Sequence, residues 1–229
     1  MLSTCIKRKY HAQMQLLTAL LIDAGLAGRV VSHAQVVRLA GGTAQRCYSL
    51  VNRALRYGEL MQLRRGLYVV APTRQVKLPH PFVLAQAVQP GSYVSFETAL
   101  GFHGWIPEAV SVTMSVLPGR RQLALQHAAL GQFCFMPLAL QRGQFLVAVD
   151  RQHFAGQVAL VAQPLRALFD MACVRKLSPA AMLDLVPAMR IDPALLAQLP
   201  SDQWQAVQAV YAHRRMAQNV ASLLAALKP

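Results

Sequence analysis

Charged side chains are scarce in this sequence, and acidic ones are the scarcest. Only 14% of the 229 residues are charged, and 9 Asp and Glu stand against 23 Lys and Arg, which gives a formal net charge of +14. Hydrophobic residues make up 55% of the chain. Disordered chains have the opposite balance, with many charges and few apolar residues. The composition therefore excludes a disordered or fibrous protein and indicates a globular one with an apolar interior or contact surface.

Cysteines are few and widely spaced. The four of them stand at Cys5, Cys47, Cys134 and Cys173, with no C-x-x-C pair and no histidines clustered beside them. Zinc sites and disulfide frameworks both depend on closely paired cysteines. We therefore expect four reduced, buried thiols and no bound metal.

Long apolar runs are also absent. No stretch approaches the roughly 18 apolar residues that a membrane span requires. The basic residues 7–9 and the apolar residues 16–22 superficially imitate a secretory signal, but His11, Gln13 and Asp23 interrupt the pattern. The apolar residues recur at helical spacing instead, which is typical of one buried helix face. We expect a cytoplasmic protein with no membrane partner.

Enzyme motifs are missing as well. The chain has no glycine-rich phosphate loop, no nucleophile elbow, no H-E-x-x-H motif and no paired carboxylates beside a lysine. We interpret His103 as a capping or partly buried residue. Asp170 and Asp150 are expected to be buried carboxylates paired with Arg166 and Arg151. The sequence thus predicts no enzyme, no catalytic residue and no cofactor.

What the chain does have is a concentration of positive charge near its start. Residues 1–77 contain twelve basic and two acidic residues, a net +10, whereas residues 78–229 contain eleven and seven, a net +4. A basic segment of this density attracts polyanions through long-range forces and counterion release. Nucleic acid and an anionic membrane surface would both fit the charge alone.

The pattern of residues 1–77 predicts a winged helix-turn-helix domain. Helices are expected over 8–24, 33–39 and 43–57, with Ser32 and Thr43 as N-caps and a Gly-Gly turn at 41–42. Two short strands, 60–63 and 67–70, follow around the basic turn 64–66 and would form the wing.

A proline-containing linker at 71–80 separates this domain from a larger one over residues 78–229. The second domain is expected to be mixed α/β and to end in helices, so that the whole chain is α+β. Ser95 is predicted to cap one of its helices, and Ser178 and Asp192 two more, each before a proline. The predicted helices are 82–89, 96–103, 164–175 and one or two within 201–227, and the predicted strands are 110–117, 132–136, 144–149 and 157–161.

The third predicted helix has the two faces that a DNA-reading helix needs. One face is an apolar stripe: Cys47, Leu50, Val51, Ala54 and Leu55. The other carries polar side chains and no acidic residue: Gln45, Arg46, Ser49, Asn52, Arg53 and Arg56. The alternative is a solvated basic surface helix, but the turn, cap, helix and basic hairpin occur in the order that DNA binding requires.

The predicted DNA contacts fall into two groups. Gln45, Arg46 and Ser49, near the helix N-terminus, are expected to read bases in the major groove. Backbone contacts are expected from Asn52, Arg53, Arg56 and, at the hairpin tip, Arg64 and Arg65. Residues 7–9 form either an arm along the DNA or a basic terminus without fixed contacts.

Four short motifs resemble the AbiEi family of antitoxin-like transcriptional regulators. They are RGLYV at 65–69, YVSFETALGFHG at 93–104, VTMS at 112–115 and AQPLRALFD at 162–170. The resemblance implies an N-terminal winged helix that represses its own promoter at inverted repeats. It also implies a C-terminal domain that counteracts a nucleotidyltransferase toxin, as in a type IV toxin-antitoxin system of phage defence.

Three functional hypotheses follow. The first is a DNA-binding repressor of its own promoter that is also an antitoxin. The second is a solitary DNA-binding regulator whose C-terminal domain senses a small ligand, which would require a concave pocket with convergent polar groups. The third, a nucleic-acid enzyme with a winged helix for targeting, would require clustered acidic residues or metal ligands, and the sequence offers none.

Overall fold

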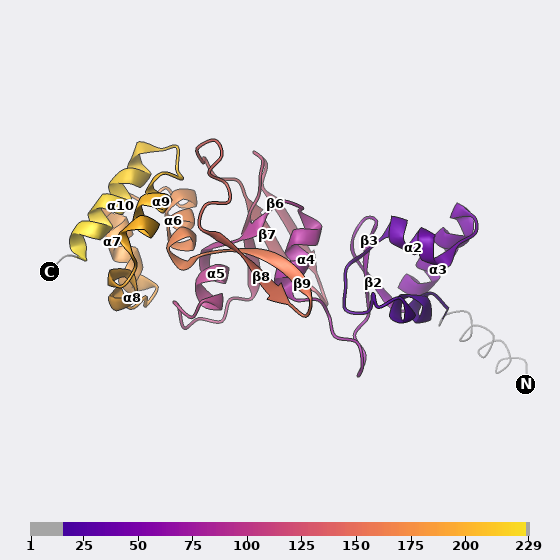
Figure 1. Ribbon diagram of the computed structural model, residues 1–229. Helices are drawn as coiled ribbons and strands as arrows, with labels where there is room; N and C mark the ends of the chain where they lie inside the picture. The colour runs from indigo at the N-terminus through magenta and orange to yellow at the C-terminus, as the bar shows by residue number, and fades with distance from the viewer. Residues whose placement is uncertain (1–15, 228–229) are drawn as a thin grey trace, which may run out of the picture. The chain divides into compact units, whose positions relative to one another are not determined.

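A computed structural model of the chain describes residues 16–227. They form two compact units, the first ending at His80 and the second beginning at Pro81. Each unit combines helices with one β-sheet, so the protein is of the mixed α+β class, as predicted (Figure 1). The boundary predicted after residue 77 lies within the stretch 71–80, which contains neither helix nor strand.

The first unit contains the helices and the hairpin predicted from its sequence. Residues 16–23 are helical, and the start predicted at residue 8 lies outside the described residues. The elements that follow are β1 (Val31–Ser32), α2 (His33–Ala40), α3 (Ala44–Arg56), β2 (Leu60–Arg64) and β3 (Leu67–Val70). The strands form an antiparallel sheet in the order β1-β3-β2, in which the two-residue β1 had not been predicted.

Local signals set the bounds of α2 and α3. The Ser32 hydroxyl accepts the Gln35 N–H at 3.3 Å, and the Gln35 side chain accepts the Ser32 N–H at 2.8 Å, which is a complete capping box. Thr43 caps α3 in the same sense by accepting the Arg46 N–H. Between the helices, Gly41 and Gly42 have φ of 61° and 80°, a region that glycine enters without steric cost.

The second unit is larger and contains a six-stranded sheet in the order β6-β7-β5-β4-β9-β8. β4 runs parallel to β9 and β5 parallel to β7, while the other neighbours are antiparallel. The first part of the unit comprises α4 (Pro81–Val88), β4 (Tyr93–Val94), α5 (Phe96–Phe102), β5 (Val112–Val116), β6 (Leu123–His127), β7 (Gly131–Met136), β8 (Val149–Phe154) and β9 (Gln157–Ala162).

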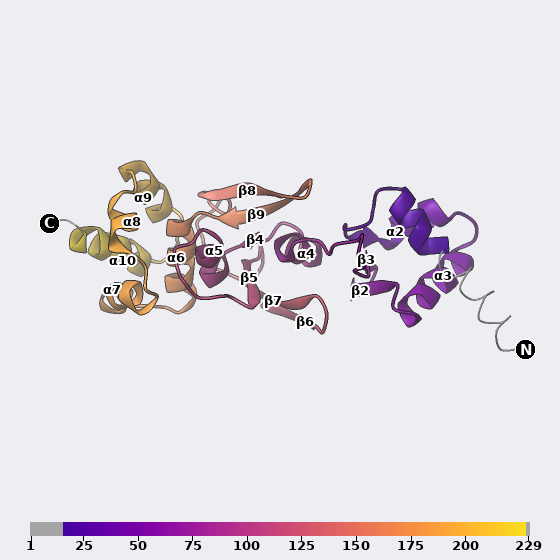
Figure 2. The ribbon, with the colours of Figure 1, turned by 90° about the horizontal axis from the view of Figure 1, so that it is seen from below.

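Five helices complete the second unit: α6 (Pro164–Val174), α7 (Pro179–Ala188), α8 (Pro193–Ala197), α9 (Ser201–Gln208) and α10 (Arg214–Ala226). Figures 1 and 2 show α7 to α10 on one side of α6 and the sheet on its other side. The predicted caps Ser178 and Asp192 are confirmed, since each accepts a backbone N–H of the first helical turn. The tail predicted as one helix or a broken pair is the pair α9 and α10.

The strand predicted at 144–149 is wrong. Residues 141–148 form turns, and the strand begins only at Val149. The backbone N–H groups of Gln144 and Val147 bond within the turns, and their carbonyls accept from Nη1 of the buried Arg166, so these groups pair with no strand. β6 was not predicted, since its residues are largely exposed at the sheet edge and lack an alternating apolar pattern.

Candidate nucleic-acid interface

α3 is anchored by the inward-facing stripe predicted from the sequence. Cys47, Val51 and Ala54 are buried, and Val51 and Ala54 belong to the core cluster of the first unit. Leu50 and Leu55 are half-buried at the edge of this core. Apolar burial on one face holds the helix while leaving the opposite face to solvent.

The outward face of α3 holds most of the predicted DNA contacts. Gln45, Ser49 and Arg56 are exposed. Asn52 and Arg53 are half-buried, so only part of each side chain faces solvent. The face therefore offers polar groups along its full length, most openly in its first two turns.

Arg46, predicted to read bases, is exposed but already bonded within the first unit. Its Nη1 donates to the carbonyl oxygens of Ala40 at 2.8 Å and Gly41 at 3.1 Å. These carbonyls belong to the C-terminal end of α2, where helix carbonyls lack partners within the helix. Arg46 thus ties α3 to α2, although the side chain stays exposed. The sequence could not reveal this contact, because it depends on the turn geometry.

Tyr48 is a surface residue of α3 that the sequence interpretation missed. Its side chain is 58% exposed, which is high for a tyrosine. It stands three residues after Gln45 and four before Asn52, so the three share one helix face. The sequence signal for Tyr48 was its spacing of three and four residues from Gln45 and Asn52.

Burial raises the pKa of Tyr68 on β3, and the nearby Tyr48 adds to this effect.

The hairpin carries two exposed arginines at its tip. Arg64 ends β2 and Arg65 stands in the turn, followed by Gly66 with φ of 77°. The Gly66 carbonyl accepts the His33 N–H at 2.8 Å, which attaches the tip of the hairpin to the start of α2. The arginines are therefore carried on a turn that is held to the helical part of the unit.

Positive charge dominates the described part of the first unit. Residues 16–80 contain nine basic and two acidic side chains, a net +7. Asp23 is the last residue of the helix 16–23, and Glu59 precedes β2. Neither acid therefore lies on α3 or in the hairpin turn. The predicted basic arm at residues 7–9 lies outside the described residues.

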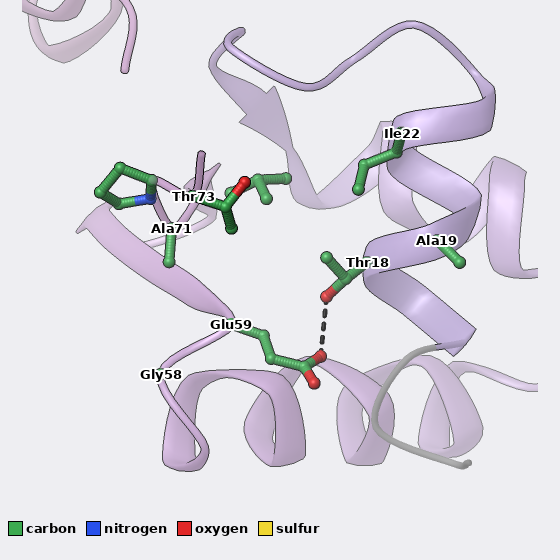
Figure 3. A pocket seen from close by; sticks show the side chains of 9 residues that line it. Thr18, Ala19, Ile22, Gly58, Glu59, Ala71 and Thr73 are labelled. Atoms are coloured by element: carbon green, nitrogen blue, oxygen red, sulfur yellow. Dashed lines mark hydrogen bonds between the residues drawn. The ribbon is translucent and has the colours of Figure 1, made fainter. Parts of the chain in front are cut away.

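The first unit also has a mostly apolar pocket of about 430 Å³ between the 16–23 helix and residues 58–59 and 70–73 (Figure 3). Thr18 and Glu59 point toward each other there, and the Thr18 hydroxyl donates to the Glu59 carboxylate at 2.7 Å. Glu59 is the one charged residue in the lining. The two polar groups that converge in this pocket are thus already bonded to each other.

A buried polar cluster occupies the second unit and is closed to solvent. It comprises Tyr93, Ser95, Arg166, Asp170 and Tyr211, all buried. The Asp170 carboxylate accepts hydrogen bonds from the other four side chains at 2.7 to 2.9 Å. This confirms the predicted pairing of Asp170 with Arg166. A carboxylate so fully satisfied is structural in character.

The pKa values in this cluster follow from burial and from its charges. Burial, followed by the charge of Asp170, raises the pKa of Tyr93 and Tyr211 well above the usual tyrosine range. Burial lowers the pKa of Arg166, but Asp170 and the two tyrosines outweigh it, so the net shift is upward. Arg166 therefore remains protonated inside the core.

Four predictions for the second unit can be compared with the structure. Ser95 caps no backbone N–H, because its hydroxyl donates to Asp170. Asp150 accepts from Gln163 at 3.1 Å rather than pairing with Arg151. Cys134 is half-buried rather than buried, because its neighbours Phe133 and Phe135 take the buried face of β7. His103 is partly buried at the C-cap of α5, as predicted.

Residues 16–227 lack two features that bear on function. Within that range, no three His, Cys, Asp or Glu side chains gather closely enough to hold a metal ion. None of the helices described there is both long and apolar enough to cross a membrane.

Comparison with known proteins gives only distant structural likenesses. No family model matches the chain, and no curated protein matches it. The chain is similar to the crystal structure of the RV2827C protein from Mycobacterium tuberculosis, with a TM-score of 0.48 and 16% identity, covering 96% of this chain and 80% of that one.

Proposed function

We propose that the protein is a sequence-specific DNA-binding transcriptional repressor whose first unit is a winged helix-turn-helix. α3 is the recognition helix and the β2–β3 hairpin is the wing. The observation that carries the proposal is the outward face of α3, where exposed Gln45, Tyr48 and Ser49 lie on a helix free of acidic residues. Arginines at the tip of the adjoining hairpin complete the basic surface.

The chemistry of this face suits the major groove, which admits one α-helix. Gln45 can make a bidentate contact with adenine, and Ser49 can bond to several base edges. The Tyr48 ring can contact a thymine methyl group. Arg56, Arg64 and Arg65 supply charge for phosphates or the minor groove, which adds affinity without sequence preference. Arg46 mainly sets the position of α3.

Repression in this proposal is steric. α3 and the wing occupy promoter DNA and thereby hinder polymerase. An operator of inverted repeats would bring two copies of the chain onto the DNA, one at each half-site.

A salt-dependent binding titration tests the proposal. The full chain is titrated against the DNA upstream of its own gene and against a random duplex of equal length. We expect a preference of about a thousandfold or more for the upstream DNA at moderate salt. Equal and salt-sensitive binding to both duplexes would show that the first unit binds DNA without sequence preference, and would refute the proposed repressor function.

An antitoxin role for the second unit rests on the AbiEi resemblance. Two motifs of that resemblance, 93–104 and 162–170, contribute Tyr93, Ser95, Arg166 and Asp170 to the buried cluster. The two motifs therefore supply buried side chains that hold the interior of the second unit together. The test is growth of cells that express a nucleotidyltransferase encoded beside this gene. Relief of growth arrest by the full chain supports the role, and persistent arrest contradicts it.

The alternative, a regulator whose second unit senses a small ligand, is favoured by one specific observation. A cavity of about 410 Å³ opens between residues 137–139, the end of α6 and the start of α10. This volume lies in the range of small-molecule sites.

A further inference from the structure

The cavity of the second unit combines apolar walls with basic side chains. Residues 137–139 and Val174 supply apolar surface, and Cys173 is buried at its edge. Lys176, His213 and Arg215 supply nitrogen groups. None of the residues that line this cavity is acidic. Lys176 and His213 are exposed and Arg215 is half-buried, and the lining itself offers a carboxylate to none of them. An acidic group that enters the cavity would supply one.

Arg215 gives the clearest sign of a missing partner. Its Nε is buried and has no hydrogen-bond partner among residues 16–227. Its charge also reaches the cavity wall: burial raises the pKa of the Cys173 thiol to about 11, and Arg215 is among the groups that oppose this rise. A buried charged donor without an acceptor is unfavourable, because it loses water and gains nothing in return.

Neighbouring groups do not neutralise this site. Asp170, one turn before Cys173 on α6, is saturated by Arg166 and three hydroxyl groups. Arg175 is paired with Glu97 outside the cavity lining. The start of α10 adds to the positive character, because this 13-residue helix has no side-chain cap at its N-terminus. Helix N-termini carry partial positive charge and unpaired N–H groups.

The backbone at Lys176 is strained for a residue other than glycine, as is that of Arg190 after α7. Lys176 follows the C-terminus of α6 with φ of 54°, in the left-handed region. The Leu177 N–H bonds back to the Ala172 carbonyl at 3.0 Å, as in a helix-ending motif where glycine is the favoured residue. A lysine is therefore held at a position that would be more stable as glycine, and its side chain lines the cavity.

We propose that this cavity binds a small organic anion through Lys176, His213 and Arg215, with a hydrophobic part of the ligand against Leu138 and Val174. The acidic group is a carboxylate or a phosphate, since both accept hydrogen bonds from guanidinium and ammonium groups. The site goes beyond DNA binding and gives the second unit a ligand of defined chemistry.

Calorimetric titration of the full chain tests the site with four probes at constant ionic strength: phenyl phosphate, benzoate, inorganic phosphate and neutral benzyl alcohol. We expect saturable binding of phenyl phosphate or benzoate, tighter than that of inorganic phosphate, and none of benzyl alcohol. Comparison of the first two probes distinguishes phosphate from carboxylate. Absence of saturable binding for both ring-bearing anions at millimolar concentration would overturn the proposal.

Three variants localise the binding. Arg215→Gln and Lys176→Gly should each weaken it about tenfold or more, because each removes a charge-assisted contact. Lys176→Gly also removes the strain of the left-handed backbone at this position, so this variant should fold. It therefore tests the site even if Arg215→Gln fails to fold. Arg214→Gln is the matched control, since Arg214 is exposed on the same helical turn and does not line the cavity. Equal weakening by Arg214→Gln would indicate diffuse attraction and overturn the site.

Discussion

Arg166 and Asp170 form an ion pair one turn apart on α6, with Nε 2.8 Å from Oδ1 and both side chains fully buried. The guanidinium also lies over the ring of Tyr93, with Cζ 5.2 Å from the centroid, and over Tyr211 at 5.5 Å. Ser95 completes the shell of the carboxylate. One pair on α6 thereby connects β4, the start of α5 and the segment before α10.

Removing one member of this pair should be strongly destabilising. Asp170→Asn is expected to lower the free energy of unfolding by about 3–5 kcal/mol, because it leaves a buried guanidinium without its counter-charge. Urea unfolding at neutral pH measures the loss. Asp184→Asn is the control, an exposed aspartate on α7 that should change stability by less than about 0.5 kcal/mol. Similar effects from both variants would show that the pair is not a structural centre.

Stability should fall in alkaline solution. The folded-state pKa of Cys173 is raised to about 11, and those of Tyr93 and Tyr211 are raised too, with burial as the first cause. A thiol with a raised pKa stabilises the fold below its unfolded pKa of about 8.5 and loses that contribution as pH rises toward 11. Urea unfolding between pH 8 and 11 should therefore show a declining free energy.

The Cys173 part of this decline can be isolated. Each group contributes up to about 1.4 kcal/mol per pH unit in the window between its two pKa values. Cys173→Ala should have a shallower decline than the parent between about pH 9 and 11. Parallel curves for the two proteins would mean that the Cys173 thiol ionises as easily in the folded chain as in the unfolded one.

Gln45→Ala should lower discrimination between operator and random DNA. Loss of a bidentate base contact is expected to reduce the difference in binding free energy by about 1–3 kcal/mol. Competition titrations with the two duplexes measure it. Gln75→Ala, an exposed glutamine outside α3, should leave discrimination unchanged. Equal weakening on both duplexes by Gln45→Ala would remove this residue from base reading.

Arg46→Ala should act differently from Gln45→Ala. It removes the bonds from Nη1 to the Ala40 and Gly41 carbonyls, which lie on the surface. We expect a stability loss of about 0.5–1 kcal/mol and a parallel weakening on both duplexes, since α3 loses its tie to α2. Thermal unfolding and the same competition titration measure the two effects. A loss confined to operator DNA, with unchanged stability, would restore the base-reading role predicted from the sequence.

Replacing Arg64 and Arg65 together by Ala should weaken binding to every DNA sequence. Each lost phosphate contact flattens the dependence of log K on log salt by about 0.9, so the pair should change the slope by one to two units. The double variant of Arg120 and Arg121 is the matched control, because it removes an adjacent exposed pair from the second unit. An unchanged slope for the hairpin variant would show that the wing does not contact DNA phosphates.

The sequence by itself determined the features that local interactions control. Ser32, Thr43, Ser178 and Asp192 are N-caps as predicted, because a cap bonds within its own first helical turn. The inward stripe of α3 follows from the three- and four-residue spacing of its apolar residues, which is likewise local. The exposure of Gln45 and Ser49 follows from the same spacing.

Only the tertiary structure decided the features that depend on partners distant in sequence. Ser95 was predicted as a cap, but its hydroxyl donates a hydrogen bond to Asp170, which lies 75 residues further along the chain. Residues 144–149 were predicted as a strand, but the carbonyls of Gln144 and Val147 accept hydrogen bonds from the Arg166 guanidinium, 22 and 19 residues away. In each case a polar group bonds to the partner that folding brings close, and sequence spacing carries no record of that distance.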